Sequence, residues 1–123
     1  MFKYLLIPFC MLMASCNIQS RANPDILLPE DKPSLVLFCD NIKPECFDTY
    51  NLMGDLSTDY DADAIAITFY FVNSVEGERA FTSLELPSYP AYVIFDANGS
   101  EISRGVGDFS REDIDAELNT VLD

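Results

Sequence analysis

The six-residue run Ser34–Cys39 (SLVLFC) constrains the fold of this chain more than any other segment. A strand with one solvated face alternates apolar and polar residues, whereas this run has no polar interruption after Ser34. It therefore predicts a strand that is buried on both faces of its sheet. Such strands are typical of α/β proteins, in which helices cover both faces.

The segments that follow alternate between strand and helix patterns. Residues 64–72 and 91–95 are β-prone runs, and helices are predicted over residues 44–60 and 76–84. A tight turn at Asn98-Gly99 predicts that residues 100–104 return as an antiparallel strand, which Gly105 and Gly107 end. Ser110, with Asp113 three residues later, predicts the start of a last helix.

The apolar residues add two details to this pattern. Residues 26–28 are a candidate for a short first strand. The helix at 44–60 is predicted to place Cys46, Tyr50, Met53 and Leu56 on one stripe. Five aromatic residues are interpreted as the core and cover of the sheet, not as a ligand site: Phe69, Tyr70, Phe71, Tyr92 and Phe95.

The N-terminal residues predict an export signal. Lys3 precedes an apolar run, residues 4–14, that is too short to span a bilayer. The segment 12–16 (LMASC) resembles a bacterial lipobox, although that pattern prefers Leu where Met13 stands. The resemblance implies cleavage after Ser15 and lipidation of Cys16, and Asn17 then favours the outer membrane. An ordinary secretory signal without lipid is the alternative.

These features divide the chain into three parts. We expect a lipoprotein signal peptide at 1–15, a tether at 16–31 and one folded domain at 32–123. The mature protein would be lipid-anchored in the bacterial cell envelope and face the periplasm. The attached lipid would then be its contact with the membrane.

Charge and composition exclude several function classes. The chain has 21 acidic against 7 basic residues, a formal charge of -14, which argues against nucleic-acid binding. It has no histidine, which excludes Ser-His-Asp and Cys-His catalysis and histidine-based zinc sites. Asp59, Asp61 and Asp63 resemble the start of a calcium loop, but Ala64 and Tyr70 stand where that pattern requires Gly and Glu. We therefore predict a solvated linker there, no metal and no cofactor.

The four cysteines separate into different fates. Cys10 would leave with the signal peptide, and Cys16 would carry the lipid. Cys39 and Cys46 then remain as thiols in a compartment that favours disulfides.

Four motifs in order resemble thioredoxin over about residues 32–123. Residues 32–38 (KPSLVLF) are similar to the strand that leads into the thioredoxin active site. Residues 43–46 (KPEC) stand where the family carries Cys-x-x-Cys at a helix start. Residues 88–91 (SYPA) fall on the cis-proline loop, and residues 106–110 match the last glycine before the final helix. The resemblance implies a thioredoxin-like α/β sandwich, with a central mixed sheet flanked by helices.

The departures from thioredoxin concern the chemistry. Lys43 stands in place of the attacking cysteine, and Leu37 in place of the buried carboxylate. Cys46 matches the resolving cysteine. Cys39 stands where thioredoxins carry Trp and shares a strand face with Leu37, which the resemblance places under Cys46. A Cys39–Cys46 disulfide is therefore implied.

Several functions remain open at this point. The disulfide is either a structural staple of loop 40–45 or a relocated redox pair that makes Cys39 and Cys46 catalytic. By resemblance, Tyr89 and Pro90 would bind a protein thiol or disulfide substrate, unless Pro90 is an ordinary trans-proline at a strand start. The alternatives are a non-catalytic binding module and a structural lipoprotein.

Overall fold

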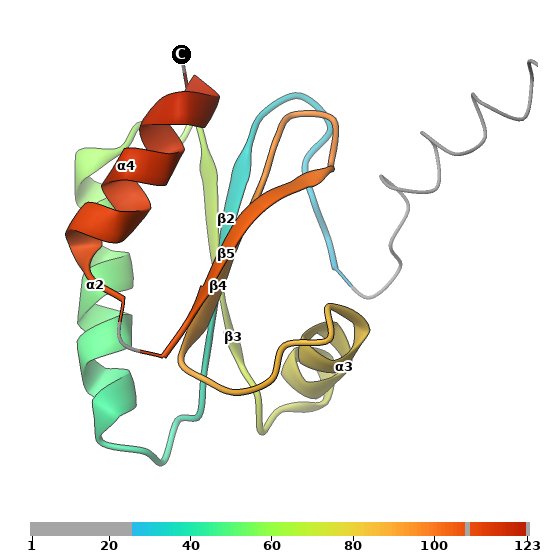
Figure 1. Cartoon of the computed structure of the whole chain (residues 1–123), viewed down its shortest axis with the longest axis vertical. Helices are drawn as coiled ribbons and strands as arrows, with labels where there is room; N and C mark the ends of the chain where they lie inside the picture. Colours follow the sequence, from blue (N-terminus) through green and yellow to red (C-terminus); the bar gives the residue numbers. More distant parts are fainter. Residues whose placement is uncertain (1–25, 108, 123) are drawn as a thin grey trace, which may run out of the picture.

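The structure is a computed structural model that describes residues 26–107 and 109–122 (Figure 1). Its strands form one four-stranded mixed sheet in the order β3-β2-β4-β5. Strand β2 is parallel to β3 and antiparallel to β4, which is antiparallel to β5. The strands are β2 (Ser34–Cys39), β3 (Ala66–Phe71), β4 (Ala91–Phe95) and β5 (Glu101–Val106); the helices are α2 (Glu45–Asp59), α3 (Val75–Ser83) and α4 (Arg111–Leu122).

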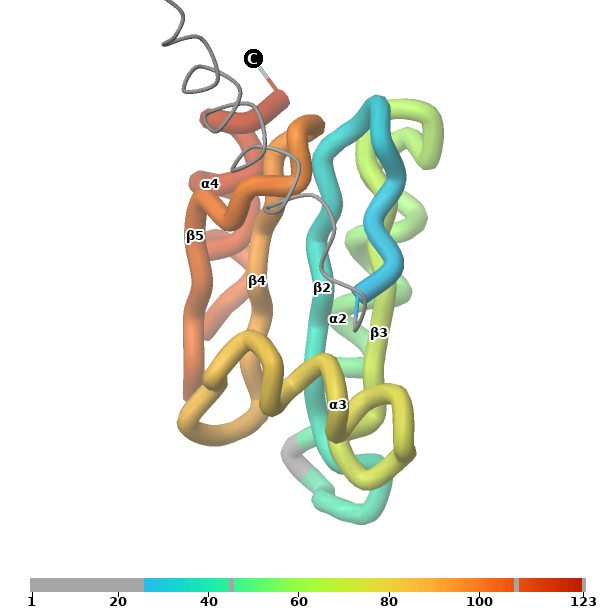
Figure 2. Tube along the Cα trace, turned by 90° about the vertical axis from the view of Figure 1, so that its right-hand side faces the viewer, coloured from blue at the N-terminus to red at the C-terminus, as the bar shows by residue number. Residues whose placement is uncertain are grey.

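Helices cover both faces of the sheet, as the run in β2 predicts. Helices α2 and α4 lie on one face and α3 on the other (Figures 1 and 2). Successive residues of β2 alternate between two apolar clusters. Leu35 and Leu37 pack with residues of α2 and α4, whereas Val36 and Phe38 pack with residues of α3. Every residue of β2 is buried.

Two local predictions are confirmed in detail. The turn before β5 closes through an Asp96 N–H bond to the Ser100 carbonyl, and Gly99 adopts a φ of 84° that suits glycine. At the start of α4, the amide of Ser110 donates to the Asp113 carboxylate over 2.8 Å. The amide of Asp113 donates back to the Ser110 hydroxyl, which completes a capping box.

Two predictions at strand boundaries are wrong. Residues 26–28 are not a strand, although Ile26 is buried in the core cluster on the α3 side. Strand β5 continues through Gly105 to Val106, where we predicted a break. Gly105 stands opposite Tyr92 in the β4–β5 pairing, and a Cβ atom at Gly105 would overlap the Tyr92 ring. The glycine is therefore required by packing and does not end the strand.

Among the described residues, none of the helices is both long and apolar enough to pass through a lipid bilayer.

Candidate functional site

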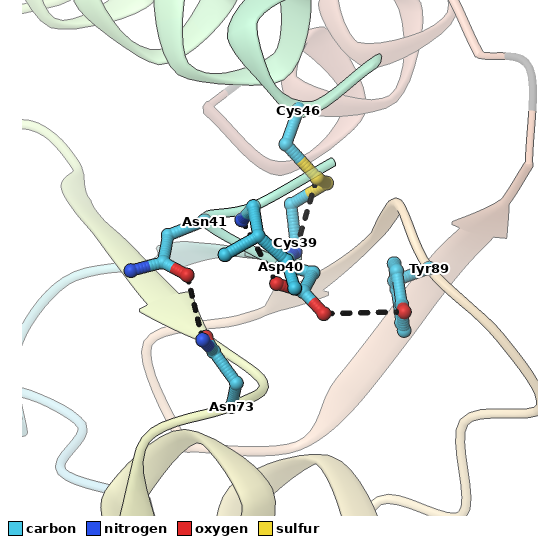
Figure 3. Close-up of a disulfide and its surroundings, with 7 residues drawn as sticks. Cys39, Asp40, Asn41, Cys46, Asn73 and Tyr89 are labelled. Atoms are coloured by element: carbon cyan, nitrogen blue, oxygen red, sulfur yellow. Dashed lines mark hydrogen bonds between the residues drawn. A yellow bond between two sulfur atoms is a disulfide. The ribbon is translucent and has the colours of Figure 1, made fainter. Parts of the chain in front are cut away.

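Cys39 and Cys46 form the disulfide that the sequence implies (Figure 3). Cys39 ends β2, and Cys46 lies in the first turn of α2, with 5.6 Å between their Cα atoms. This separation is typical of disulfides. Cys39 is 0% exposed and Cys46 is 5% exposed. Cys46 is therefore the member of the pair that lies nearer to solvent.

The loop between the two cysteines is organised around Asp40. The backbone amide of Asp40 donates a hydrogen bond to Sγ of Cys46 over 3.0 Å. Its carboxylate accepts a bond from the amide of Ile42 over 2.9 Å, and the residue is buried. A backbone N–H that points at a sulfur atom favours negative charge on that atom.

Tyr89 joins this loop to the segment before β4. The Tyr89–Pro90 peptide bond is cis, as the resemblance implies. The hydroxyl of Tyr89 donates to the other carboxylate oxygen of Asp40 over 3.3 Å (Figure 3). The four site residues predicted in the folded domain, Cys39, Cys46, Tyr89 and Pro90, are thus gathered at one end of the sheet. Cys16 lies outside the described residues.

Two hollows open near the N-terminal half of α2. The first has a volume of about 380 Å³ and is called the proline hollow; it is lined by Asp48, Thr49, Leu52, Tyr89, Pro90, Gly107 and Phe109. The second has a volume of about 270 Å³ and is called the aromatic hollow; it is lined by Asn41, Lys43, Cys46, Phe47, Tyr50 and Phe71. Of these two, only the aromatic hollow is lined by a cysteine.

The aromatic hollow is lined by three exposed aromatic residues, and two of them, Tyr50 and Phe71, correct the sequence interpretation. Phe47 is 69% exposed, Tyr50 50% and Phe71 37%. The buried stripe of α2 runs through Cys46, Thr49 and Leu56, so Tyr50 lies beside it and not within it. Phe71 is the last residue of β3 and is not covered as a core residue would be. Phe47 lies three residues before Tyr50 on the same helix, so the two rings share one helix face. This spacing was the sequence signal that could have indicated an exposed aromatic surface.

The remaining candidates have structural surroundings. Leu37, which the thioredoxin resemblance aligns with the family carboxylate, is fully buried among apolar side chains. Lys43 is exposed at the rim of the aromatic hollow. In the acidic segment, Asp59 pairs with Arg111 over 2.7 Å, and Asp61 accepts a bond from the amide of Asp63. These contacts fit the predicted linker.

Comparison with known proteins places the fold. No protein-family model matches the chain, and no curated protein sequence matches it. Solved structures match it closely in shape. A thioredoxin-like superfamily protein aligns with a TM-score of 0.65 at 14% identity, over 76% of this chain and 81% of the other. The chain has the thioredoxin fold.

Two thioredoxins give the same result. An oxidized thioredoxin from Arabidopsis thaliana aligns with a TM-score of 0.64 at 12% identity, over 91% of this chain and 89% of the other. A thioredoxin from Malassezia sympodialis aligns with the same score at 18% identity, over 76% and 80%. The thioredoxin-like mixed sheet with its flanking helices is thus confirmed, and at these identities the likeness concerns the fold alone.

Proposed function

We propose that this chain is a thiol–disulfide exchange protein of the bacterial envelope whose redox pair is Cys39 and Cys46. The observation that carries the proposal is the position of the disulfide. It joins the end of β2 to the first turn of α2 and lies against a hollow that Cys46 lines. The thioredoxin fold and a pair of cysteines that forms a disulfide support redox chemistry in general terms.

Cys46 is the sulfur that a partner attacks. Cys39 has no exposed surface, whereas Cys46 has a small exposed fraction and borders solvent at the aromatic hollow. Cys46 also receives the hydrogen bond from the amide of Asp40 and lies at the N-terminus of α2. Both features stabilise the Cys46 thiolate, which is the leaving group when the mixed disulfide is resolved and the attacking group when the reaction runs in reverse.

The exchange reaction follows from this geometry. A thiolate of a partner dithiol attacks Sγ of Cys46 and forms a mixed disulfide. The Cys39–Cys46 bond breaks, its electron pair goes to Sγ of Cys39, and that thiolate takes a proton from water. The partner's second thiolate then attacks the partner sulfur in the mixed disulfide and releases Cys46. Two electrons pass to the cysteine pair and the partner is oxidised to a disulfide. The reverse sequence reduces a partner disulfide.

Tyr89 and Pro90 have a supporting role in this proposal. They line the proline hollow, and the bond from Tyr89 to Asp40 holds that hollow against the loop of the disulfide. An extended substrate segment would be positioned by this edge.

The second candidate function is non-catalytic. Complete burial of Cys39 favours a structural staple, since a cycling cysteine must become a thiol in the core. In that case the chain is a binding module, or a structural lipoprotein, with a fixed bridge.

A trapping experiment separates the two functions. The reduced Cys39→Ser variant keeps the Cys46 thiol but lacks the resolving sulfur, so we expect it to accumulate mixed disulfides with partner proteins. The Cys46→Ser variant is the matched control and should trap none. Wild-type protein should reduce insulin disulfides. If the wild-type protein does not reduce insulin and the Cys39→Ser variant traps no mixed disulfide, the disulfide is a structural staple.

Membrane anchoring through Cys16 is part of the proposal and rests on the lipobox resemblance of residues 12–16. We expect mass spectrometry of the mature protein to find a lipidated Cys16 at the N-terminus. Replacement Cys16→Ser should release the protein from the membrane fraction into the periplasm. An unmodified mature N-terminus would instead support an ordinary secretory signal.

A further inference from the structure

We infer that partners reach Cys46 through the aromatic hollow, and that this hollow binds an uncharged aromatic or long aliphatic side chain next to the partner's cysteine. The inference rests on the proposed exchange function and adds its substrate class. It concerns the side of Cys46 away from the cis-proline.

The composition of the aromatic hollow makes it a site for an apolar side chain. Phe47, Tyr50 and Phe71 expose large aromatic surfaces around it, and exposed aromatic surface that gathers in one place marks an interaction site. The volume of about 270 Å³ lies just below the range of about 300–1,000 Å³ for hollows that bind whole small molecules. It therefore suits one or two side chains of a polypeptide.

The walls of the aromatic hollow are held by contacts behind them. The Phe69 ring packs edge-on against Tyr50 at 5.5 Å and against Phe71 at 5.1 Å. On the loop side, the side-chain amide of Asn73 donates to the side chain of Asn41 over 2.6 Å (Figure 3). This bond ties the loop after β3 to the loop of the disulfide. A preformed hollow lowers the ordering cost of binding.

The proline hollow gives less direct access to the disulfide. Neither cysteine is among its lining residues. The Tyr89–Asp40 hydrogen bond spans the route from Pro90 to the loop that carries the disulfide. A thiol that approaches from the aromatic side meets Cys46 without displacing that bond.

Charge selects among the possible partners. The chain has a formal charge of -14, so acidic partners are repelled at long range. Lys43 lines the aromatic hollow and disfavours a Lys or Arg side chain within it. The negative net charge of the chain favours a neutral or basic partner segment. Lys43 favours an uncharged aromatic or aliphatic partner side chain in the hollow, next to the partner's reacting cysteine.

Two pentapeptides test the inference on the oxidised protein. One is Lys-Phe-Cys-Phe-Lys, and the other has alanine in place of both phenylalanines. The measured quantity is the rate of mixed-disulfide formation with Cys46, after acid quench and mass spectrometry. We expect the phenylalanine peptide to react about 10-fold faster, because it buries apolar surface in the hollow. Equal rates for the two peptides would overturn the inference.

Two variants test whether the faster reaction of the phenylalanine peptide depends on the aromatic hollow. Phe47→Ala removes an exposed side chain that lines the aromatic hollow, and should bring the reaction rates of the two peptides close to each other. Ile102→Ala removes an exposed apolar side chain of β5 that lines neither hollow, and should keep the preference. A preference that survives Phe47→Ala would place the binding site elsewhere.

A non-covalent measurement separates this inference from the exchange function. The peptide Lys-Phe-Ser-Phe-Lys cannot react, and we expect it to shift the NMR signals of Phe47, Tyr50 and Phe71. If dithiothreitol does not reduce the disulfide, the exchange function is contradicted, but binding of this peptide in the aromatic hollow is not. Shifts confined to Phe109 in the proline hollow would overturn the inference. So would a concentration-dependent dimer that Phe47→Ala abolishes, because a second copy would then be the occupant.

Discussion

The hydroxyl of Tyr89 donates a hydrogen bond to the carboxylate of Asp40 over 3.3 Å, although the two residues are 49 positions apart. Asp40 uses its amide to bond Sγ of Cys46 over 3.0 Å. The cis-proline loop and the disulfide are thus joined through one buried acidic residue. The thioredoxin resemblance aligns Leu37 with the family's buried carboxylate, whereas Asp40 is the acidic residue that directly follows Cys39.

Tyr89→Phe removes one hydrogen bond to a buried carboxylate and nothing else of the side chain. We expect the free energy of unfolding to fall by about 0.5–1.5 kcal/mol, as measured by urea denaturation. Tyr70→Phe is the matched control, because the Tyr70 ring stacks on Phe38 and its hydroxyl bonds to none of the described residues. An equal loss in both variants would show that the Tyr89 bond contributes nothing specific.

Removal of the disulfide should destabilise the fold without abolishing it. The bridge closes a loop with a sequence separation of 7, for which the chain-entropy model gives about 2–3 kcal/mol. We therefore expect the free energy of unfolding to fall by this amount in the Cys39→Ala/Cys46→Ala double variant and in reduced wild-type protein. Both should show a lower urea midpoint. Unchanged stability in both would mean that the bridge does not constrain the unfolded chain.

Two glycines predict opposite effects of the same substitution. Gly105→Ala places a Cβ atom against the Tyr92 ring, and we expect a loss of about 1–3 kcal/mol in the free energy of unfolding. Gly54→Ala lies within α2, where a Cβ atom meets nothing, and should stabilise the protein by about 0.5–1 kcal/mol. Thermal or urea unfolding of the two variants measures both signs. A stabilising Gly105→Ala would contradict the packing described here.

We expect the free energy of unfolding to fall at alkaline pH because two tyrosines have a raised pKa in the folded protein. Burial, together with a hydrogen bond to Asp115, raises the pKa of Tyr60 to about 12. Burial and a bond to Glu117 raise the pKa of Tyr92 to about 12. Because the protonated form is favoured in the folded state, this contribution is complete below pH 10, the ordinary tyrosine value. It is lost as the pH rises through about 12.

Urea midpoints measured across this alkaline range check the prediction. We expect the wild-type midpoint to fall as the pH rises, and Tyr60→Phe to make the fall shallower. Tyrosinate absorbance should show two tyrosines that titrate near pH 12. Titration of all tyrosines near the ordinary value in the folded protein would contradict it.

Much of the fold could be predicted from local patterns. The uninterrupted run Ser34–Cys39 specifies a central strand, because only burial on both faces tolerates it. The capping box at Ser110 and the turn at Gly99 are local chemistry and were predicted correctly. The Cys39–Cys46 bridge followed from the thioredoxin resemblance together with the alternation of side chains along β2.

The aromatic hollow could not be predicted in the same way. Phe47 lies in the first turn of α2 and Phe71 at the end of β3, and whether aromatic residues at such ends are covered depends on the neighbouring elements. Gly105 was misread for a related reason. Its role depends on the β4–β5 register that places it opposite Tyr92, and no local pattern records that pairing.

The most direct test of the exchange function is the reduction potential of the Cys39–Cys46 pair, measured by mass spectrometry of alkylated thiols in glutathione buffers. If the pair exchanges with partner thiols, its potential should lie between about -270 and -120 mV, the range of dithiol pairs that cycle. A potential below about -300 mV, which is typical of structural disulfides in secreted proteins, would contradict the exchange function.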